Sequence, residues 1–190
     1  ICLAISPALK DKGVKNRCRI YEIPENINYI IAKPRMKLYM EKSAEIFSIY
    51  LKYVSPEDMH IYSVDECFID LKDYEKLYNK SAVELAKMLI GEVYKQTKIR
   101  ATVGIGPNLF LAKVALDITA KHSPDFIGVL DEKTFKETIW FHRPITDVWN
   151  VGKGIANRLE RMGVYDLHGI TETPENVLYK EFGINAELLI

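Results

Sequence analysis

The chain has 190 residues, 48% of them hydrophobic, and its 26 basic residues balance 26 acidic ones, which suits one substantial core with a small appendage. No apolar run approaches the length of a transmembrane helix and no signal peptide is visible, so no membrane partner is expected. Three cysteines without metal-ligand spacing imply neither a disulfide framework nor a zinc site, which fits a reducing cytosol.

The first 35 residues are predicted to form a short strand, a short helix and a loop that begins at Arg17. Basic residues outnumber acidic ones by nine to four between Lys10 and Lys42. Such an excess suits a surface near phosphates, although an ordinary solvated face has the same composition. A long amphipathic helix is predicted over about residues 37–53, because its apolar residues recur at helical spacing.

Short strands and helices are then predicted to alternate along the chain. Strands flank Asp65 and Glu66, and a helix covers about residues 82–97. A strand at residues 101–105, a helix at residues 108–119 capped by Asn108, and a strand near residues 127–130 follow. Helical residues begin again near Thr146. This order predicts an α+β protein: a split βαβ (ferredoxin-like) domain with helices on one face and its first strand upstream, plus a small helical unit.

Two adjacent carboxylates, Asp65 and Glu66, stand between the apolar runs of the first strand pair. Charge is costly beside buried strands unless it is paired or binds a metal. A tight turn would let both carboxylates face one hard cation, and Mg²⁺ prefers oxygen ligands together with substrate phosphates. A bare Asp-Glu pair is more often a polar hairpin turn, so the flanking residues decide between the two interpretations.

The flanking residues, Tyr62-Ser63-Val64-Asp65-Glu66-Cys67-Phe68-Ile69-Asp70, resemble the signature of Y-family (DinB/UmuC-type) translesion DNA polymerases. The resemblance implies that Asp65 and Glu66 are catalytic carboxylates and metal ligands, whereas Asp70 is structural. It further implies two Mg²⁺ ions in the complete enzyme, which would add dNTPs to the primer of primer-template DNA in translesion synthesis and SOS-type DNA repair.

A second segment, residues 101–117, resembles the strand and helix that follow in that family. Lys121 occupies the place of the family's triphosphate-contacting lysine, after a segment one residue longer than the commonest version. Lys113 is interpreted as a solvated or structural lysine. In the opening segment, Lys10 falls where the family has a triphosphate-contacting arginine, and Pro7 replaces a tyrosine, a variant closer to UmuC-like proteins of Gram-positive bacteria. Lysine keeps the charge but loses the bidentate fork.

A third segment, residues 145–159, resembles the start of the family's thumb. Gly152 and Gly154 allow a tight turn, and amides at the start of the next helix make an anion site. Gly152, Lys153 and Gly154 are therefore predicted to bind DNA phosphates in a helix-hairpin-helix-like element. By resemblance, residues 1–35 are part of the fingers, residues 36–144 the catalytic palm and residues 145–190 the thumb.

The resemblance stops before the family's C-terminal DNA-gripping domain, and the family's first metal-binding aspartate has no counterpart in the chain. We therefore expect an internal fragment of a cytoplasmic bacterial enzyme that is inactive alone, with a sliding clamp contacted through a region outside this chain. Two alternatives stay open. One is a non-catalytic DNA-binding or interaction module, and the other is a different palm-type nucleotidyl enzyme, such as a nucleotide cyclase.

Overall fold

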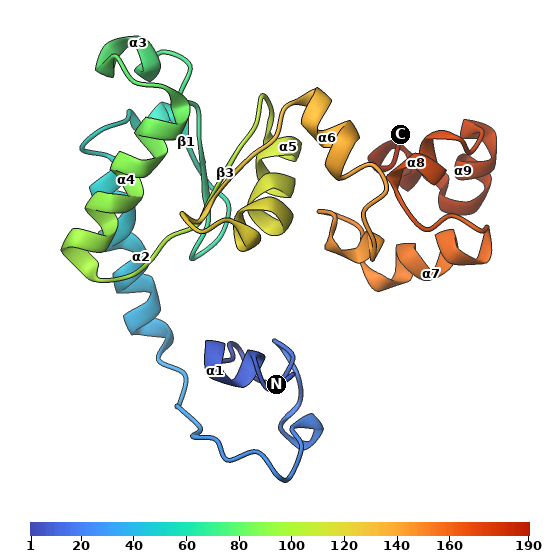
Figure 1. Ribbon diagram of the computed structural model, residues 1–190, viewed down its shortest axis with the longest axis horizontal. Helices are drawn as coiled ribbons and strands as arrows, with labels where there is room; N and C mark the ends of the chain where they lie inside the picture. The colour runs from blue at the N-terminus through green and yellow to red at the C-terminus, as the bar shows by residue number, and fades with distance from the viewer. The chain divides into compact units, whose positions relative to one another are not determined.

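The computed structural model describes residues 1–190, which form two compact units, Ile1–Glu45 and Ile46–Ile190. The first unit holds α1 (Pro7–Lys10), a 3₁₀ turn η1 (Ile20–Glu22) and the start of α2 (Met36–Tyr50), which runs into the second unit (Figure 1). Pro7 occupies the first turn of α1, where a missing N–H costs nothing. The short strand predicted before this helix does not form. Four buried side chains make a small separate core: Ile5, Val14, Cys18 and Ile23.

The second unit alternates short strands with helices, in the order that the sequence predicts. Its elements are η2 (Pro56–Asp58), β1 (Met59–Ile61), β2 (Cys67–Ile69), α3 (Tyr74–Tyr78), α4 (Ala82–Thr97), β3 (Val103–Ile105), α5 (Leu109–Val114), η3 (Ala115–Thr119), η4 (Ala120–His122), β4 (Ile127–Val129), α6 (Glu132–Thr138), η5 (Ile145–Asp147), α7 (Lys153–Arg161), α8 (Leu167–Thr171), α9 (Glu175–Phe182) and η6 (Gly183–Leu188).

Side-chain caps set the starts of the two helices nearest the strands. Ser81 caps α4 by accepting from the backbone N–H of Glu84, whose carboxylate bonds back to Ser81, so α4 begins where the sequence predicts. Asn108 caps α5 by accepting from the N–H of Leu111 at 2.9 Å. The predicted helix at residues 108–119 is α5 followed directly by η3, which is a π-helical turn.

The four strands pair two by two. β1 and β2 are antiparallel, with His60 opposite Phe68, and β3 and β4 are parallel, with Gly104 opposite Gly128. The helix between β3 and β4 packs directly on this parallel pair. A Cβ added to Gly128 would lie 2.5 Å from the carbonyl oxygen of Ala115, so the glycines allow the helix backbone to approach the strands.

The predicted α+β class is confirmed. The strands lie between α4 and α5 in Figure 1, and both helices contact β3. No helix combines the length and the apolar content needed to cross a membrane.

One apolar core joins the middle of the chain to its C-terminal helices. A single cluster contains Val114 and Ala115 of the α5 region together with Leu159 of α7 and Leu178 of α9, all fully or almost fully buried. The boundary predicted between residues 144 and 145 is therefore not a break in the core. The assignment of these regions to fingers, palm and thumb stays a prediction.

Candidate active site

The predicted carboxylates lie on the turn that joins β1 to β2. The N–H groups of Tyr62 and Ser63 both donate to the carbonyl oxygen of Glu66, at 3.0 Å each, and close the turn. Asp65 is exposed, and its Oδ1 accepts a 2.9 Å hydrogen bond from the Ser63 hydroxyl. The turn therefore presents the Asp65 carboxylate to solvent while keeping it within reach of Glu66, its neighbour in the chain.

Glu66 is bound by a lysine from the helix that packs on β3. Lys113 Nζ donates to Glu66 Oε1 at 2.8 Å and to Oε2 at 2.9 Å. The same ammonium lies 3.2 Å from Asp117 Oδ2, one helical turn further along. Lys113 is only 7% exposed, so of the two interpretations, a solvated or a structural lysine, the solvated one is wrong. The structure instead brings Lys113 and Asp117 into the predicted site.

Burial and charge act in opposite directions on Lys113. Burial alone lowers the pKa of its ammonium, but hydrogen bonds to Glu66 and the charges of Asp117 and Glu66 outweigh burial, so the pKa is raised. Lys113 is therefore a fixed positive charge at neutral pH. Cys67, next to Glu66 in β2, behaves differently: burial raises the pKa of its thiol to about 11. A protonated thiol is a poor metal ligand, which leaves oxygen donors at this turn.

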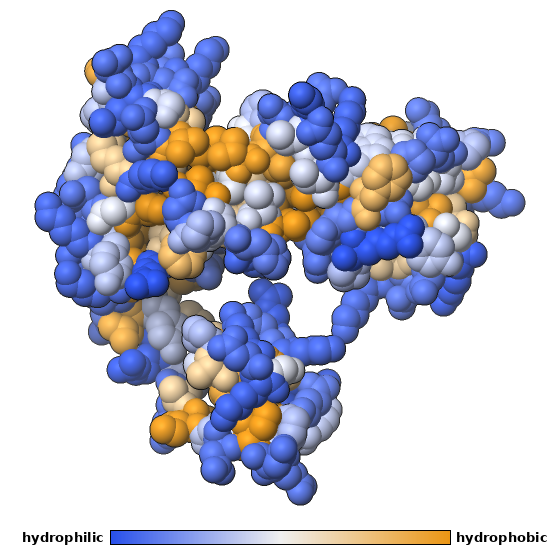
Figure 2. Space-filling model, viewed as in Figure 1, coloured by the Kyte–Doolittle hydropathy of each residue, from blue (hydrophilic) through white to orange (hydrophobic).

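Aromatic side chains link the turn to the start of the predicted thumb. Trp149 Nε1 donates a 3.2 Å hydrogen bond to the Tyr62 hydroxyl, and the two rings meet edge to face with centroids 5.9 Å apart. Phe68 of β2 lies 6.2 Å from the Trp149 ring. Figure 2 shows hydrophobic surface over the strand region. Ile61 and Val64, on either side of Ser63, have exposed side chains.

Lys121 does not contact the carboxylate turn. It is exposed in η4 and lines a polar cleft of about 350 Å³ with Asp117, His142 and Asp147. The cleft shares Asp117 with the Lys113 cluster but contains neither Asp65 nor Glu66. The π-turn η3 precedes Lys121, and a π-turn holds one residue more than an α-turn. The π-turn η3 thus lies in the segment before Lys121 that is one residue longer than the commonest family version.

The remaining predicted site residues are exposed. Lys10 ends α1 in the first unit. Gly152 is the N-cap of α7, and Lys153 and Gly154 are its first two residues. A Cβ added to either glycine would meet nothing within 4 Å, so a partner backbone or phosphate has room to approach. The amides of this first turn have no partner within an α-helix, which is the property that the anion-site prediction needs.

An ion pair between the exposed Arg143 and the buried Asp166 lies at the start of α8. Asp166 caps α8 by accepting from the Gly169 N–H at 2.9 Å, and it binds the Arg143 guanidinium at 2.7 Å. Burial raises the pKa of the Asp166 carboxyl, but the Gly169 N–H and Arg143 outweigh burial, so the pKa lies below its ordinary value. The connection from α7 to α8 is therefore fixed by a charged side chain at its end.

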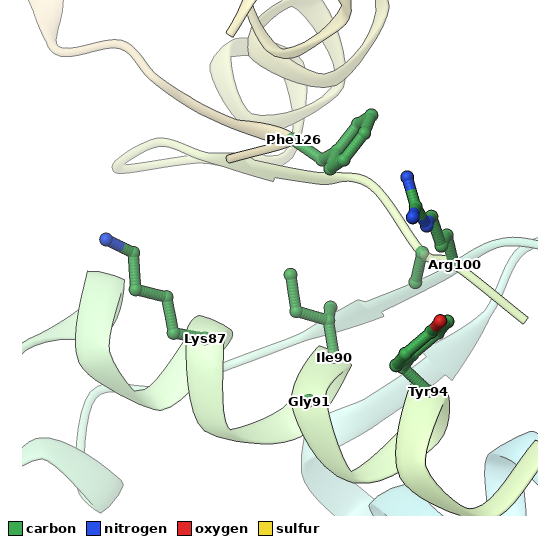
Figure 3. A pocket seen from close by; sticks show the side chains of 7 residues that line it. Lys87, Ile90, Gly91, Tyr94, Arg100 and Phe126 are labelled. Atoms are coloured by element: carbon green, nitrogen blue, oxygen red, sulfur yellow. The ribbon is translucent and has the colours of Figure 1, made fainter. Parts of the chain in front are cut away.

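A second hollow contains none of the predicted residues. Figure 3 shows a shallow pocket of about 250 Å³ beside α4, lined by Ile90 and Tyr94 of the helix and by Arg100 and Phe126. The Arg100 guanidinium lies 5.8 Å from the ring centroids of both Tyr94 and Phe126. Arg100 therefore makes cation–π contacts with two residues of the fold.

Comparison with known proteins identifies the family of the chain. The sequence profile described as the impB/mucB/samB family matches residues 1–117, more than half of the chain. The chain belongs to this family. The resemblance to Y-family polymerases that the motifs predict is confirmed.

The relatives of this impB/mucB/samB chain are much longer than it is. It is 34% identical over 190 residues to DNA polymerase IV 2 of Bacillus subtilis, covering all of the chain and 45% of that protein. It is 33% identical over 168 residues to DNA polymerase IV of Pseudomonas syringae pv. tomato, covering 84% of the chain and 43% of that protein. The chain thus spans less than half the length of these relatives.

Solved structures of the family share the fold. The structure described as an insertion ternary complex of Dbh DNA polymerase matches with a TM-score of 0.77 and 25% identity, over 96% of the chain and 52% of that protein. DinB from Sulfolobus solfataricus matches with a TM-score of 0.70 and 26% identity, over 84% of the chain and 46% of that protein.

Sequence reasoning missed Lys113 and Asp117 as members of the site in this impB/mucB/samB chain. Their four-residue spacing puts them on one face of a helix, where an ion pair is ordinary. The available signal was that Lys113 stands among apolar residues in the sequence. Leu111, Val114 and Ala115 are all buried in the structure, and a lysine buried among them needs a carboxylate partner.

Proposed function

We propose that the chain carries catalytic carboxylates of a DNA-directed DNA polymerase that adds dNTPs to a primer in translesion synthesis and SOS-type DNA repair. The observation that carries the proposal is the exposed hairpin turn of Asp65 and Glu66, beside a buried lysine, in a chain of the impB/mucB/samB family. Its relatives support the proposal, because one is named DNA polymerase IV and a similar solved structure is a ternary complex of a DNA polymerase. A cytoplasmic location and a sliding clamp partner belong to the same proposal.

The donor chemistry of the turn fits magnesium. Asp65 and Glu66 are hard oxygen donors, and no group of three or more potential metal ligands surrounds them. Magnesium is commonly held in this way, by one or two carboxylates completed with water and substrate phosphates. Two bound Mg²⁺ ions would stabilise the attacking and leaving oxygens of phosphoryl transfer. The chain's own part would be to fix the two carboxylates on a rigid turn.

Cationic side chains would act on the triphosphate. Lys121, exposed beside Asp117, and Lys10, exposed at the end of α1, would neutralise phosphate charge, which is the main electrostatic demand of phosphoryl transfer. Gly152, Lys153 and Gly154 would hold the phosphates of primer-template DNA without reading its bases.

Primer extension by the full-length polypeptide that contains these residues tests the proposal. We expect a DNA primer to be extended on its template only when Mg²⁺ is present. Activity should disappear with a chelator and return with added Mg²⁺, because the Asp65 and Glu66 carboxylates are proposed to act by holding the metal. ATP or GTP without DNA is the control for a nucleotide cyclase. Cyclic nucleotide formation, or DNA binding with no extension at any Mg²⁺ concentration, would reject the polymerase.

The start of α7 makes a separate prediction about DNA affinity. Lys153→Glu is expected to weaken primer-template binding equally for different sequences, and to reduce the slope of log affinity against log salt by about one, because one phosphate contact is lost. Lys180→Glu, at an exposed position on α9, makes the same charge change as a control. Fluorescence anisotropy over a salt series measures both. Equal weakening by the two variants would mean that only overall charge matters.

A further inference from the structure

Lys113 holds an unusual position for a lysine. Its ammonium is buried between two carboxylates that come from different parts of the chain: Glu66 on the hairpin turn, and Asp117 in the π-turn η3. It also lies 5.9 Å from the ring centroid of Tyr62. Burying a lone ammonium is costly, so these partners explain how Lys113 remains inside the protein.

The contact with Glu66 competes with metal binding. Both Glu66 oxygens accept from Lys113 Nζ, at 2.8 and 2.9 Å. A divalent cation that uses this carboxylate meets a positive charge already bound to it, and two cations on one carboxylate repel each other strongly at such distances. Metal ligation by Glu66 therefore requires that Lys113 weakens its hold on Glu66.

Asp117 offers the ammonium a second partner that needs no large movement. Its carboxylate is already 3.2–3.3 Å from Nζ, slightly further than Glu66. Two carboxylates and one ammonium give the Lys113 cluster a formal charge of minus one, which favours the approach of a cation. The same arrangement balances the Glu66 charge in the folded protein without a metal.

We propose that Lys113 is an internal counter-ion that occupies Glu66 while the site holds no metal and transfers to Asp117 when a metal takes Glu66. This inference rests on the proposed metal-binding role of Asp65 and Glu66. Lys113 is in this view a positioning residue: it sets the affinity of the site for a divalent cation through Glu66. Asp117 affects metal binding only by accepting the Lys113 ammonium.

Mn²⁺ binding to the full-length polypeptide, followed by the electron paramagnetic resonance signal of the free ion, tests the inference without DNA or dNTP. Lys113→Met removes the competing charge at similar length, so Mn²⁺ affinity should rise by about tenfold or more. Asp117→Asn removes the alternative partner and keeps Lys113 on Glu66, so affinity should fall. Lys113→Arg keeps the charge and should keep Mn²⁺ binding weak. Lys136→Met, which breaks an exposed pair with Glu132, should change nothing.

A double-mutant cycle separates transfer from simple charge effects. If Asp117 acts through Lys113, Asp117→Asn should have little effect in the Lys113→Met background. An equal loss in both backgrounds would mean that Asp117 merely attracts the ion, and would overturn the inference. Circular dichroism melting checks that each variant folds. If Lys113→Met does not fold, the test is the Mn²⁺ affinity of Asp117→Asn compared with that of the unsubstituted protein. An unchanged affinity overturns the inference.

Asp65→Asn separates this inference from the proposed function. If Mn²⁺ binding depends on Asp65 but does not rise in Lys113→Met, the inference fails and the metal site stands. If Mn²⁺ binding is indifferent to Asp65, or absent in every variant, the metal site proposed for Asp65 and Glu66 fails and the inference fails with it.

Discussion

Asp65→Asn is expected to slow nucleotide addition by about 10² to 10³-fold, the cost of removing one electrostatic group that stabilises a transition state. Asparagine keeps the shape of the side chain and its contact with Ser63 but loses the negative charge that a metal ligand needs. Asp65 is exposed, and its carboxylate bonds only to its own turn, so stability should change by less than about 0.5 kcal/mol. Single-turnover primer extension with the full-length polypeptide measures the rate.

Asp70→Asn is the matched control for this experiment. Asp70 is an exposed aspartate five residues further along, and its Oδ1 accepts from the Lys72 N–H at 2.9 Å. The family resemblance makes it structural, so its amide variant should extend primers at nearly the normal rate. Equal slowing by the two variants, or normal rates in both, would remove Asp65 from the catalytic role.

Gly104→Ala is expected to destabilise the second unit by more than about 4 kcal/mol, a size typical of severe core disruption. The new Cβ would overlap the carbonyl oxygen of Ala112 and the backbone nitrogen of Leu116, and would lie 2.8 Å from Leu116 Cα. These are backbone atoms of α5 and η3, which cannot rotate away as a side chain can. The helix would have to move off β3, and Lys113 would move with it.

Gly91→Ala is the opposite control. Gly91 lies inside α4, and a Cβ added there meets nothing within 4 Å. Alanine is a better helix former than glycine, so this variant should be more stable by about 1 kcal/mol. Urea denaturation followed by circular dichroism gives both changes as shifts in midpoint. A Gly104→Ala midpoint near that of the unsubstituted protein would mean that α5 packs less tightly on β3 than described.

The local structure and the family can be predicted from neighbouring residues in the chain. The start of α4 follows from the Ser81 cap, and the start of α5 follows from the Asn108 cap, because a cap acts on amides within three residues. The Asp65 and Glu66 turn is predictable for the same reason, since two apolar runs and a charged pair are adjacent in the chain. The prediction of a short opening strand is wrong, because an isolated strand has no neighbouring strand with which to form hydrogen bonds.

The surroundings of the carboxylates depend on contacts between residues that are far apart in the chain. Lys113 meets Glu66 across 47 residues, and Trp149 meets Tyr62 across 87 residues. Neither contact has a periodicity or spacing that a sequence displays. The Lys113 contact depends on α5 packing closely against β3, which places a lysine among apolar side chains beside the hairpin. The ion pairs that keep Lys113 charged despite its burial follow from this packing, because desolvation and ion pairing depend on neighbours in space.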